Sequence, residues 1–178
     1  MENIAQVLEN GSSEEKIQIL EKLESANEPE ILDKIISKLD DDDIQVRGEA
    51  FSSLVLNKNK ISNFLIKNLK SASKNIRGFS LLVLANRNEV DAIPEIIKLV
   101  GDERSMVRTC AIGALNFLKA KDEREIFLKS INDQNLEVRK SAVQAIIDLK
   151  IPIKEEQIDK IITENDIEIE NLILQLKN

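Results

Sequence analysis

Four arginines recur at a nearly constant interval and are the first candidates for chemistry in this sequence. Each follows a valine or an isoleucine, and their spacings are 30, 31 and 31 residues: Arg47, Arg77, Arg108 and Arg139. A row of guanidinium groups could bind an extended anion, because each group presents a planar fork of hydrogen-bond donors. The residue six positions before each arginine is acidic or polar: Asp41, Ser71, Asp102 and Asp133. The alternative is therefore a structural role, in which each arginine bridges a carboxylate and the carbonyl groups of a turn.

Other reactive residue types are scarce. The sequence has no histidine, tryptophan or tyrosine and a single cysteine, Cys110. A cluster of His and Glu metal ligands and a cysteine–histidine nucleophile are therefore both absent. The aspartate run at residues 40–43 lacks the alternating spacing and central glycine of an EF-hand, so we interpret it as a helix-capping turn. We expect no catalytic residue, no metal site and no cofactor, and we predict that the protein is not an enzyme.

Composition and charge narrow the class further. Hydrophobic residues make up 42% and charged residues 32% of the 178 residues, which is typical of a globular chain. The net charge of −7 opposes binding to phosphate backbones and argues against a nucleic-acid partner. The apolar runs are far shorter than the ~20 residues that a membrane span needs. With one cysteine and no visible secretory signal, we expect a cytoplasmic protein that does not bind membranes.

A second column of residues keeps the same period as the arginines. Its members are apolar pairs four residues apart, which share one helical face: Ile4/Leu8, Ile35/Leu39, Leu65/Leu69, Ile96/Val100, Phe127/Ile131 and Ile158/Ile162. The pairs are spaced by 31, 30, 31, 31 and 31 residues, so one residue is missing between Arg47 and Leu65, near residues 57–59. A fixed period of this length predicts stacked repeats.

Each repeat is predicted to be a helix A, a tight turn and a helix B. The six units, approximately 1–26, 27–57, 58–87, 88–119, 120–150 and 151–178, would form a single domain. The predicted helices cover residues 2–9 and 13–25, 29–39 and 43–57, 60–70 and 73–86, 90–100 and 104–119, 122–131 and 135–149, and 154–163 and 166–177. Oxygen-bearing residues that can cap the B helices precede them: Ser12-Ser13, Asp40 to Asp43, Ser71/Ser73, Gly101-Asp102 and Asn132-Asp133. Pro29, Pro94 and Pro152 fall near the starts of A helices.

The fourth and fifth repeats resemble a known family. The stretch DAIPEIIKLVGDERSMVRTCAIGALNFL, which begins at Asp91, resembles a HEAT repeat of the short type named after phycobilisome lyases. NDQNLEVRKSAVQAIIDL, which begins at Asn132, resembles the second half of that motif. The resemblance is strong over residues 41–149 and weaker at both ends, where Lys16 and Glu170 occupy the arginine column.

The resemblance implies an all-α fold, a right-handed α-solenoid of about six HEAT-like helix pairs. It also implies a ladder of aspartates and arginines between adjacent repeats, formed by Asp41, Arg47, Arg77, Asp102, Arg108, Asp133 and Arg139. Ser71 interrupts the acidic column because it cannot carry a charge, so we expect the ladder to be weakest there.

The face of helix B opposite the expected buried arc is uncharged in the second to fourth repeats. It comprises Gly48, Ser52, Val55, Gly78, Leu82, Ala85, Thr109, Gly113 and Asn116, with Phe79, Cys110 and Phe117 beside it. In HEAT-like arrays the B helices line the concave surface, so this face could be a groove for a partner protein. The alternative is that small residues only relieve crowding between neighbouring B helices.

We therefore predict a non-catalytic protein–protein interaction scaffold or adaptor that binds a partner protein on the concave B-helix face. The alternative is a regulatory or lyase-like subunit associated with an enzyme, and nucleic-acid binding is a third, weaker reading. The last helix has more apolar residues than an end cap requires: Ile167, Ile169, Leu172, Ile173, Leu174 and Leu176. This pattern fits either deep packing in a monomer or a weak homodimer formed through that helix.

Overall fold

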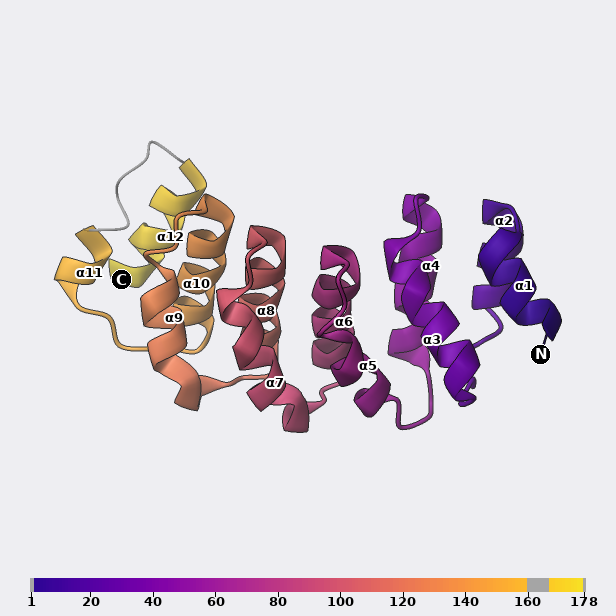
Figure 1. Cartoon of the computed structure of the whole chain (residues 1–178). Helices are drawn as coiled ribbons and strands as arrows, with labels where there is room; N and C mark the ends of the chain where they lie inside the picture. The colour runs from indigo at the N-terminus through magenta and orange to yellow at the C-terminus, as the bar shows by residue number, and fades with distance from the viewer. Residues whose placement is uncertain (1, 160–166, 178) are drawn as a thin grey trace. The chain divides into compact units, whose positions relative to one another are not determined.

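The computed structural model describes residues 2–159 and 167–177, and the described residues contain helices but no strand (Figure 1). The all-α class predicted from the repeat period is confirmed by this helical content. The chain divides into two compact units, Met1–Glu95 and Ile96–Asn178. The single-domain organisation stays a prediction.

Unit 1 consists of two layers of helices. Its elements are α1 (Glu2–Asn10), α2 (Ser13–Leu20), α3 (Pro29–Ser37), η1 (Lys38–Asp40), α4 (Ile44–Leu56), α5 (Ser62–Asn68), α6 (Lys74–Asn86) and η2 (Val90–Ala92). The A helices α1, α3 and α5 are neighbours, and the B helices α2, α4 and α6 form the second layer. Buried leucines and isoleucines fill the space between the layers, among them Leu8, Leu20, Ile35, Leu54 and Leu65.

Unit 2 repeats this arrangement. Its elements are α7 (Ile93–Ile97, which spans the unit boundary), η3 (Lys98–Gly101), α8 (Ser105–Phe117), η4 (Lys121–Glu123), α9 (Arg124–Ser130), α10 (Leu136–Asp148), α11 (Glu155–Asp159) and α12 (Ile167–Lys177). Helix α10 packs against α8, α9 and α12 (Figure 1). The core includes Phe127 and the B-helix residues predicted to face inward in α8, which are Val107, Ala111, Ala114 and Leu115.

Most B helices begin with the kind of cap that the sequence suggests. Ser12 and Glu15 form a capping box at α2, and Asp43 and Ser73 cap α4 and α6 through their side chains. In unit 2 the prediction was wrong by two residues or more, because the N-cap positions are Arg104 and Asn135 rather than the aspartates before them. Those aspartates, Asp102 and Asp133, instead accept a hydrogen bond from the backbone N–H of the N-cap residue two positions later.

Two predicted helix boundaries were also wrong. Helix α2 ends at Leu20 rather than near residue 25, since the backbone N–H groups of Lys22, Leu23 and Ala26 bond to carbonyl groups three residues earlier. The A helix predicted over residues 90–100 is divided into η2, α7 and η3. Pro94 lies in this stretch and has no N–H to donate, which disfavours one continuous helix. The apolar pair member Ile162 lies outside the described residues.

Two kinds of helix end occur among the B helices α4, α6, α8 and α10. Helices α6, α8 and α10 are each followed by a residue with a positive φ, Asn88 (55°), Lys119 (57°) and Lys150 (52°). The next residue's N–H then bonds back to the helix, as in Ala120 to the Leu115 carbonyl at 3.0 Å. Helix α4 is followed by Asn57, with an ordinary φ of −58°. The residue that the second repeat lacks is therefore the left-handed one.

The end of α4 is held instead by side chains. The Asn57 amide donates to the Ala26 carbonyl at 2.9 Å, and the Asn59 amide donates to the Ser25 carbonyl at 3.0 Å. From the end of α6, Arg87 donates to the carbonyl groups of Leu54 (3.2 Å) and Asn59 (2.8 Å) and also to that of Asn57. Side-chain donors thus satisfy the carbonyl groups that a left-handed cap would otherwise cover.

Candidate functional site

Each arginine of the repeating column is bonded to its own turn. In all four, Nη1 donates to the backbone carbonyl groups six and five residues earlier. For Arg108 these are the carbonyl groups of Asp102 at 2.9 Å and Glu103 at 3.3 Å. The residue six positions earlier also accepts a backbone N–H two residues later, as in Asp133, whose Oδ1 accepts from the Asn135 N–H at 2.8 Å. The column therefore stabilises the turn between helix A and helix B.

An ion pair extends this arrangement to the next repeat within each unit. In unit 2, Arg108 donates from Nε to Oδ2 of Asp133 and from Nη2 to Oδ1, both at 2.8 Å. In unit 1, Lys16 occupies the arginine column and its Nζ lies 2.9 Å from Oδ2 of Asp41. The residue of the next repeat that corresponds to Asp133 for Arg47 is Ser71, which has no carboxylate. The predicted contact between Arg77 and Asp102 would join the two units and stays a prediction.

The electrostatics of the two ladder carboxylates follow from these contacts. Burial raises the pKa of Asp133, but the hydrogen bonds from Arg108 and from the Asn135 N–H and the charges of Arg108 and Arg139 lower it, and the net pKa lies below its ordinary value. Burial likewise raises the pKa of Asp41, and the hydrogen bonds from Lys16 and from the Asp43 N–H outweigh it. Both carboxylates are therefore charged throughout the neutral range.

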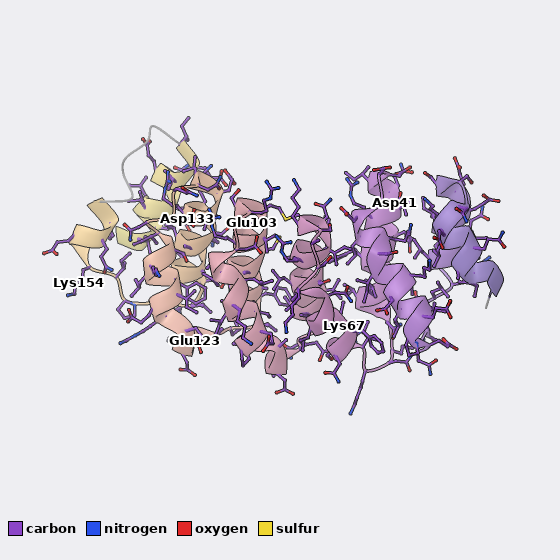
Figure 2. All side chains as sticks on the ribbon, in the orientation of Figure 1. Asp41, Lys67, Glu103, Glu123, Asp133 and Lys154 are labelled. Carbon is purple, nitrogen blue, oxygen red and sulfur yellow. The ribbon has the colours of Figure 1, made fainter. Side chains whose placement is uncertain are left out.

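The arginine column does not form an exposed row. Arg77, Arg108 and Arg139 are 8%, 7% and 7% exposed. In unit 2, Figure 2 shows Asp133 and Glu103 at the end of the helices where the turns between helix A and helix B lie. Glu123 lies at the opposite end of the helices. An anion-binding row would need guanidinium groups that point into solvent, so these buried groups do not form one. Their role is structural.

The predicted groove residues of unit 1 differ in exposure. Gly48 is exposed, whereas Ser52, Val55 and Leu82 are half-buried. A Cβ atom added to Gly48 would meet no atom outside the helix backbone within 4 Å. Gly78 and Ala85 are buried. Because α6 packs against α3, α4 and α5, these two residues offer a partner little surface and are removed from the candidate site.

The predicted groove residues of unit 2 are all partly accessible. Thr109, Gly113 and Asn116 are half-buried, and a Cβ atom added to Gly113 would meet nothing within 4 Å. The Asn116 amide donates to Oδ2 of Asp148 at 2.7 Å, and the Gln144 amide donates to Oδ1 at 2.7 Å. This face therefore carries a carboxylate that the sequence argument missed. Asp148 and Gln144 lie one helical turn apart on α10, in the fifth repeat, whereas the sequence prediction covered only the second to fourth repeats.

The face in unit 1 has a charged border. Glu49 follows Gly48 directly on α4, which packs against α2. Burial raises the pKa of Glu49, and the nearby charges of Glu21 and Glu24 add to that increase. The predicted uncharged residues of this face are therefore bordered by a carboxylate.

The flanking residues have structural environments. Phe51 and Phe79 meet edge to face, with ring centroids 6.5 Å apart, and join α4 to α6. Burial raises the pKa of the Cys110 thiol to about 11, so at neutral pH the group is a protonated thiol and a poor nucleophile. Phe117 is 55% exposed at the end of α8.

The last helix is partly buried. Ile169, Leu172 and Ile173 are buried, and α12 packs against α10. Ile167 and Leu174 remain 77% and 60% exposed. Nζ of Lys140 on α10 donates a hydrogen bond to Oε2 of Glu168 on α12 at 2.8 Å. Deep packing accounts for three of the six apolar residues, and a homodimer through the other residues stays a prediction.

Within the described ranges, no three His, Cys, Asp or Glu side chains gather in a way that could hold a metal ion. None of the described helices is long and apolar enough to cross a membrane.

The family model for HEAT repeats matches residues 62–147. The repeats in this stretch are therefore HEAT repeats. No protein of curated function matches the sequence. The resemblance expected from the stretch after Asp91 is thereby confirmed.

Solved structures with HEAT-like or armadillo folds match the chain at low identity. The complex of CpcE and CpcF of phycocyanin lyase from Nostoc sp. PCC7120 matches with a TM-score of 0.68 and 16% identity, covering 83% of this chain and 98% of that chain. A designed armadillo repeat protein in complex with the peptide (KR)4 matches with a TM-score of 0.56 and 18% identity, covering 98% and 97%. A structure concerned with TOG–tubulin binding specificity matches with a TM-score of 0.58 and 14% identity, covering 99% and 82%. At these identities the likeness shows the fold alone.

Proposed function

We propose that this HEAT-repeat chain is a non-catalytic interaction scaffold of the cytoplasm that binds a partner protein on the exposed faces of its B helices. The observation that carries the proposal is the open space at Gly48 and Gly113. A Cβ atom at either residue would meet nothing within 4 Å, so relief of crowding does not account for glycine there. Each glycine costs about 1 kcal/mol in a helix interior relative to alanine. Close approach of a partner's backbone is a functional reason to keep it.

The surroundings of both glycines support a protein segment as the occupant. Ser52 and Val55 lie one and two turns after Gly48 and are half-buried, and Thr109 and Asn116 lie one turn on either side of Gly113. These residues combine small apolar surface with hydrogen-bonding groups, which suits main-chain and side-chain contacts. The (KR)4 peptide bound by the designed armadillo protein fits the same class of occupant, with Glu49 and Asp148 as acidic borders here.

The experiment is affinity purification from the native cell with three matched proteins. The wild type, the Gly48→Ala/Gly113→Ala double variant and the Gly48→Lys/Gly113→Lys double variant are compared by quantitative mass spectrometry. Alanine and lysine are both better helix formers than glycine, so neither change should reduce the stability of the fold. We expect partners recovered by the wild type to be kept or reduced slightly with alanine and lost with lysine. Equal recovery with all three proteins would rule out the proposed face.

A regulatory or lyase-like subunit is the second candidate, prompted by the match to the phycocyanin lyase complex. That match shows only the fold, and Cys110 is a half-buried thiol with a raised pKa. Mixing the protein with a free bilin tests the candidate, and an unchanged absorption spectrum would count against it.

A further inference from the structure

A hollow of about 510 Å³ opens in unit 2 between the end of the fourth A helix and α9. Its walls are the half-buried side chains of Ile97, Val100 and Ile126, and its floor is the Arg108–Asp133 pair. Lys129 lies at the rim. The volume falls in the range of about 300–1,000 Å³ that small-molecule sites occupy.

Two side chains of the hollow are smaller than those at the matching positions of unit 1. Val100 and Ile126 occupy the places that Leu39 and Phe64 hold two repeats earlier. In unit 1, Leu39 and its neighbour Ile36 are 0% and 1% exposed, and Phe64 is half-buried. The larger leucine is thus fully packed in unit 1, whereas the smaller Val100 is half-buried and lines the hollow.

The polar groups of the hollow favour an anion. Both oxygens of Asp133 already accept hydrogen bonds, from Arg108 and from the Asn135 N–H. Arg108 and Asp133 cancel in charge, and Lys129 forms no ion pair within the part of the chain that the structure describes. Its counterpart Lys67 lies 3.7 Å from a carboxylate oxygen of Asp33. The hollow therefore has one uncompensated positive charge beside apolar walls.

We propose that this hollow binds a small aliphatic carboxylate. The carboxylate group lies at Lys129, and the hydrocarbon part packs on Ile97, Val100 and Ile126. The site is separate from the B-helix faces, because its walls come from A helices and from the turn after α9.

The test is an NMR titration of methyl-labelled full-length protein with hexanoate, with hexanol as the neutral control. We expect saturable shifts of the Ile97, Val100 and Ile126 methyl signals with hexanoate. Ile126→Phe, which copies Phe64, should weaken binding by about tenfold, equivalent to about 1.4 kcal/mol. Val100→Leu, which copies Leu39, provides a second filled variant if the first one loses its fold.

A charge variant distinguishes the contribution of the carboxylate group to binding from that of the hydrocarbon chain. Lys129→Gln should weaken hexanoate roughly two- to fivefold, as expected for a partly exposed ion pair, and leave hexanol unchanged. Lys67→Gln in unit 1 is the matched control and should change neither. The proposal is overturned if wild-type protein gives no saturable shift, if the filled variants bind as well as the wild type, or if hexanol binds as tightly as hexanoate.

Discussion

The turn before α4 in unit 1 and the turn before α8 in unit 2 share one backbone arrangement. They differ in whether the arginine also pairs with a carboxylate of the next repeat. In both, arginine Nη1 donates to two carbonyl groups of its own turn. Arg108 also forms a bidentate pair with Asp133, whereas Arg47 has Ser71 at the matching position. The comparison indicates that the contact common to these arginines is the one with the carbonyl groups of their own turn. The ion pair to the next repeat is an addition that one repeat lacks.

The same two regions differ in packing. Leu39 is fully buried in unit 1, and its smaller counterpart Val100 lines a hollow in unit 2. Helix ends differ as well, since α4 lacks the left-handed residue that follows α8 and α10. A repeat period therefore conserves backbone positions more strongly than side-chain volume.

The largest expected effect comes from removing the arginine of each turn. Arg108→Ala should lower the free energy of unfolding by about 3 kcal/mol, because it removes two carbonyl contacts and leaves the Asp133 carboxylate without its partner. Arg47→Ala removes only the carbonyl contacts and should cost about 1 kcal/mol. Urea denaturation of both variants measures the difference. Equal losses would show that the ion pair adds nothing.

Acid should lower the stability that the paired carboxylates contribute. The pKa values of Asp41 and Asp133 are lowered in the folded protein from an ordinary value of 3.8, so the unfolded chain binds more protons near that pH. The stability from these groups is present above about pH 4 and is lost as the pH falls through the folded pKa values. Urea midpoints between pH 7 and pH 3 should fall more steeply for the wild type than for Asp133→Asn. Parallel curves would contradict this prediction.

Restoring the missing carboxylate should bring unit 1 closer to unit 2. Ser71→Asp places an acceptor opposite Arg47 and can keep the turn contact to the Ser73 N–H, which Ser71 Oγ now accepts at 3.2 Å. We expect a gain of about 1 kcal/mol at low salt, reduced at high salt. The gain should vanish in the Arg47→Ala background, and a gain that persists there would have another cause.

The smallest effect concerns the helix ends. Lys119 has a φ of 57°, a conformation that disfavours side chains with a Cβ atom. Lys119→Gly should therefore raise the free energy of unfolding by roughly 0.5–1 kcal/mol, measured by thermal and urea unfolding. Lys58→Gly is the matched control after α4, where no left-handed residue occurs, and it should be neutral or destabilising.

The repeat period predicted much of this structure from particular residues. Val107, Ala111, Ala114 and Leu115 share one helical face, and all four are buried. Ser12, Asp43 and Ser73 cap the helices that they precede. These features follow from local geometry, because helical spacing and cap chemistry depend on a few neighbouring residues.

The candidate site was predictable only in part. Gly48 and Gly78 occupy the same column of helix B, yet one is exposed and the other buried. Asp133 was predicted both as a cap and as a ladder residue; it pairs with Arg108 but accepts a turn N–H instead of capping α10. Contacts of this kind depend on side chains from other repeats, which a single helical wheel does not contain.

The sequence by itself determined the six-fold repeat, the helix pairs, the buried arc and the position of the missing residue near Asn57. Each of these depends on spacing along the chain. Only the tertiary structure decided that Arg108 holds its own turn as well as Asp133, that space is open at Gly48 and Gly113, and that Val100 lines a hollow. The physical reason is that burial and free volume depend on how side chains from neighbouring repeats fill the same space, and the repeat period does not specify those side chains.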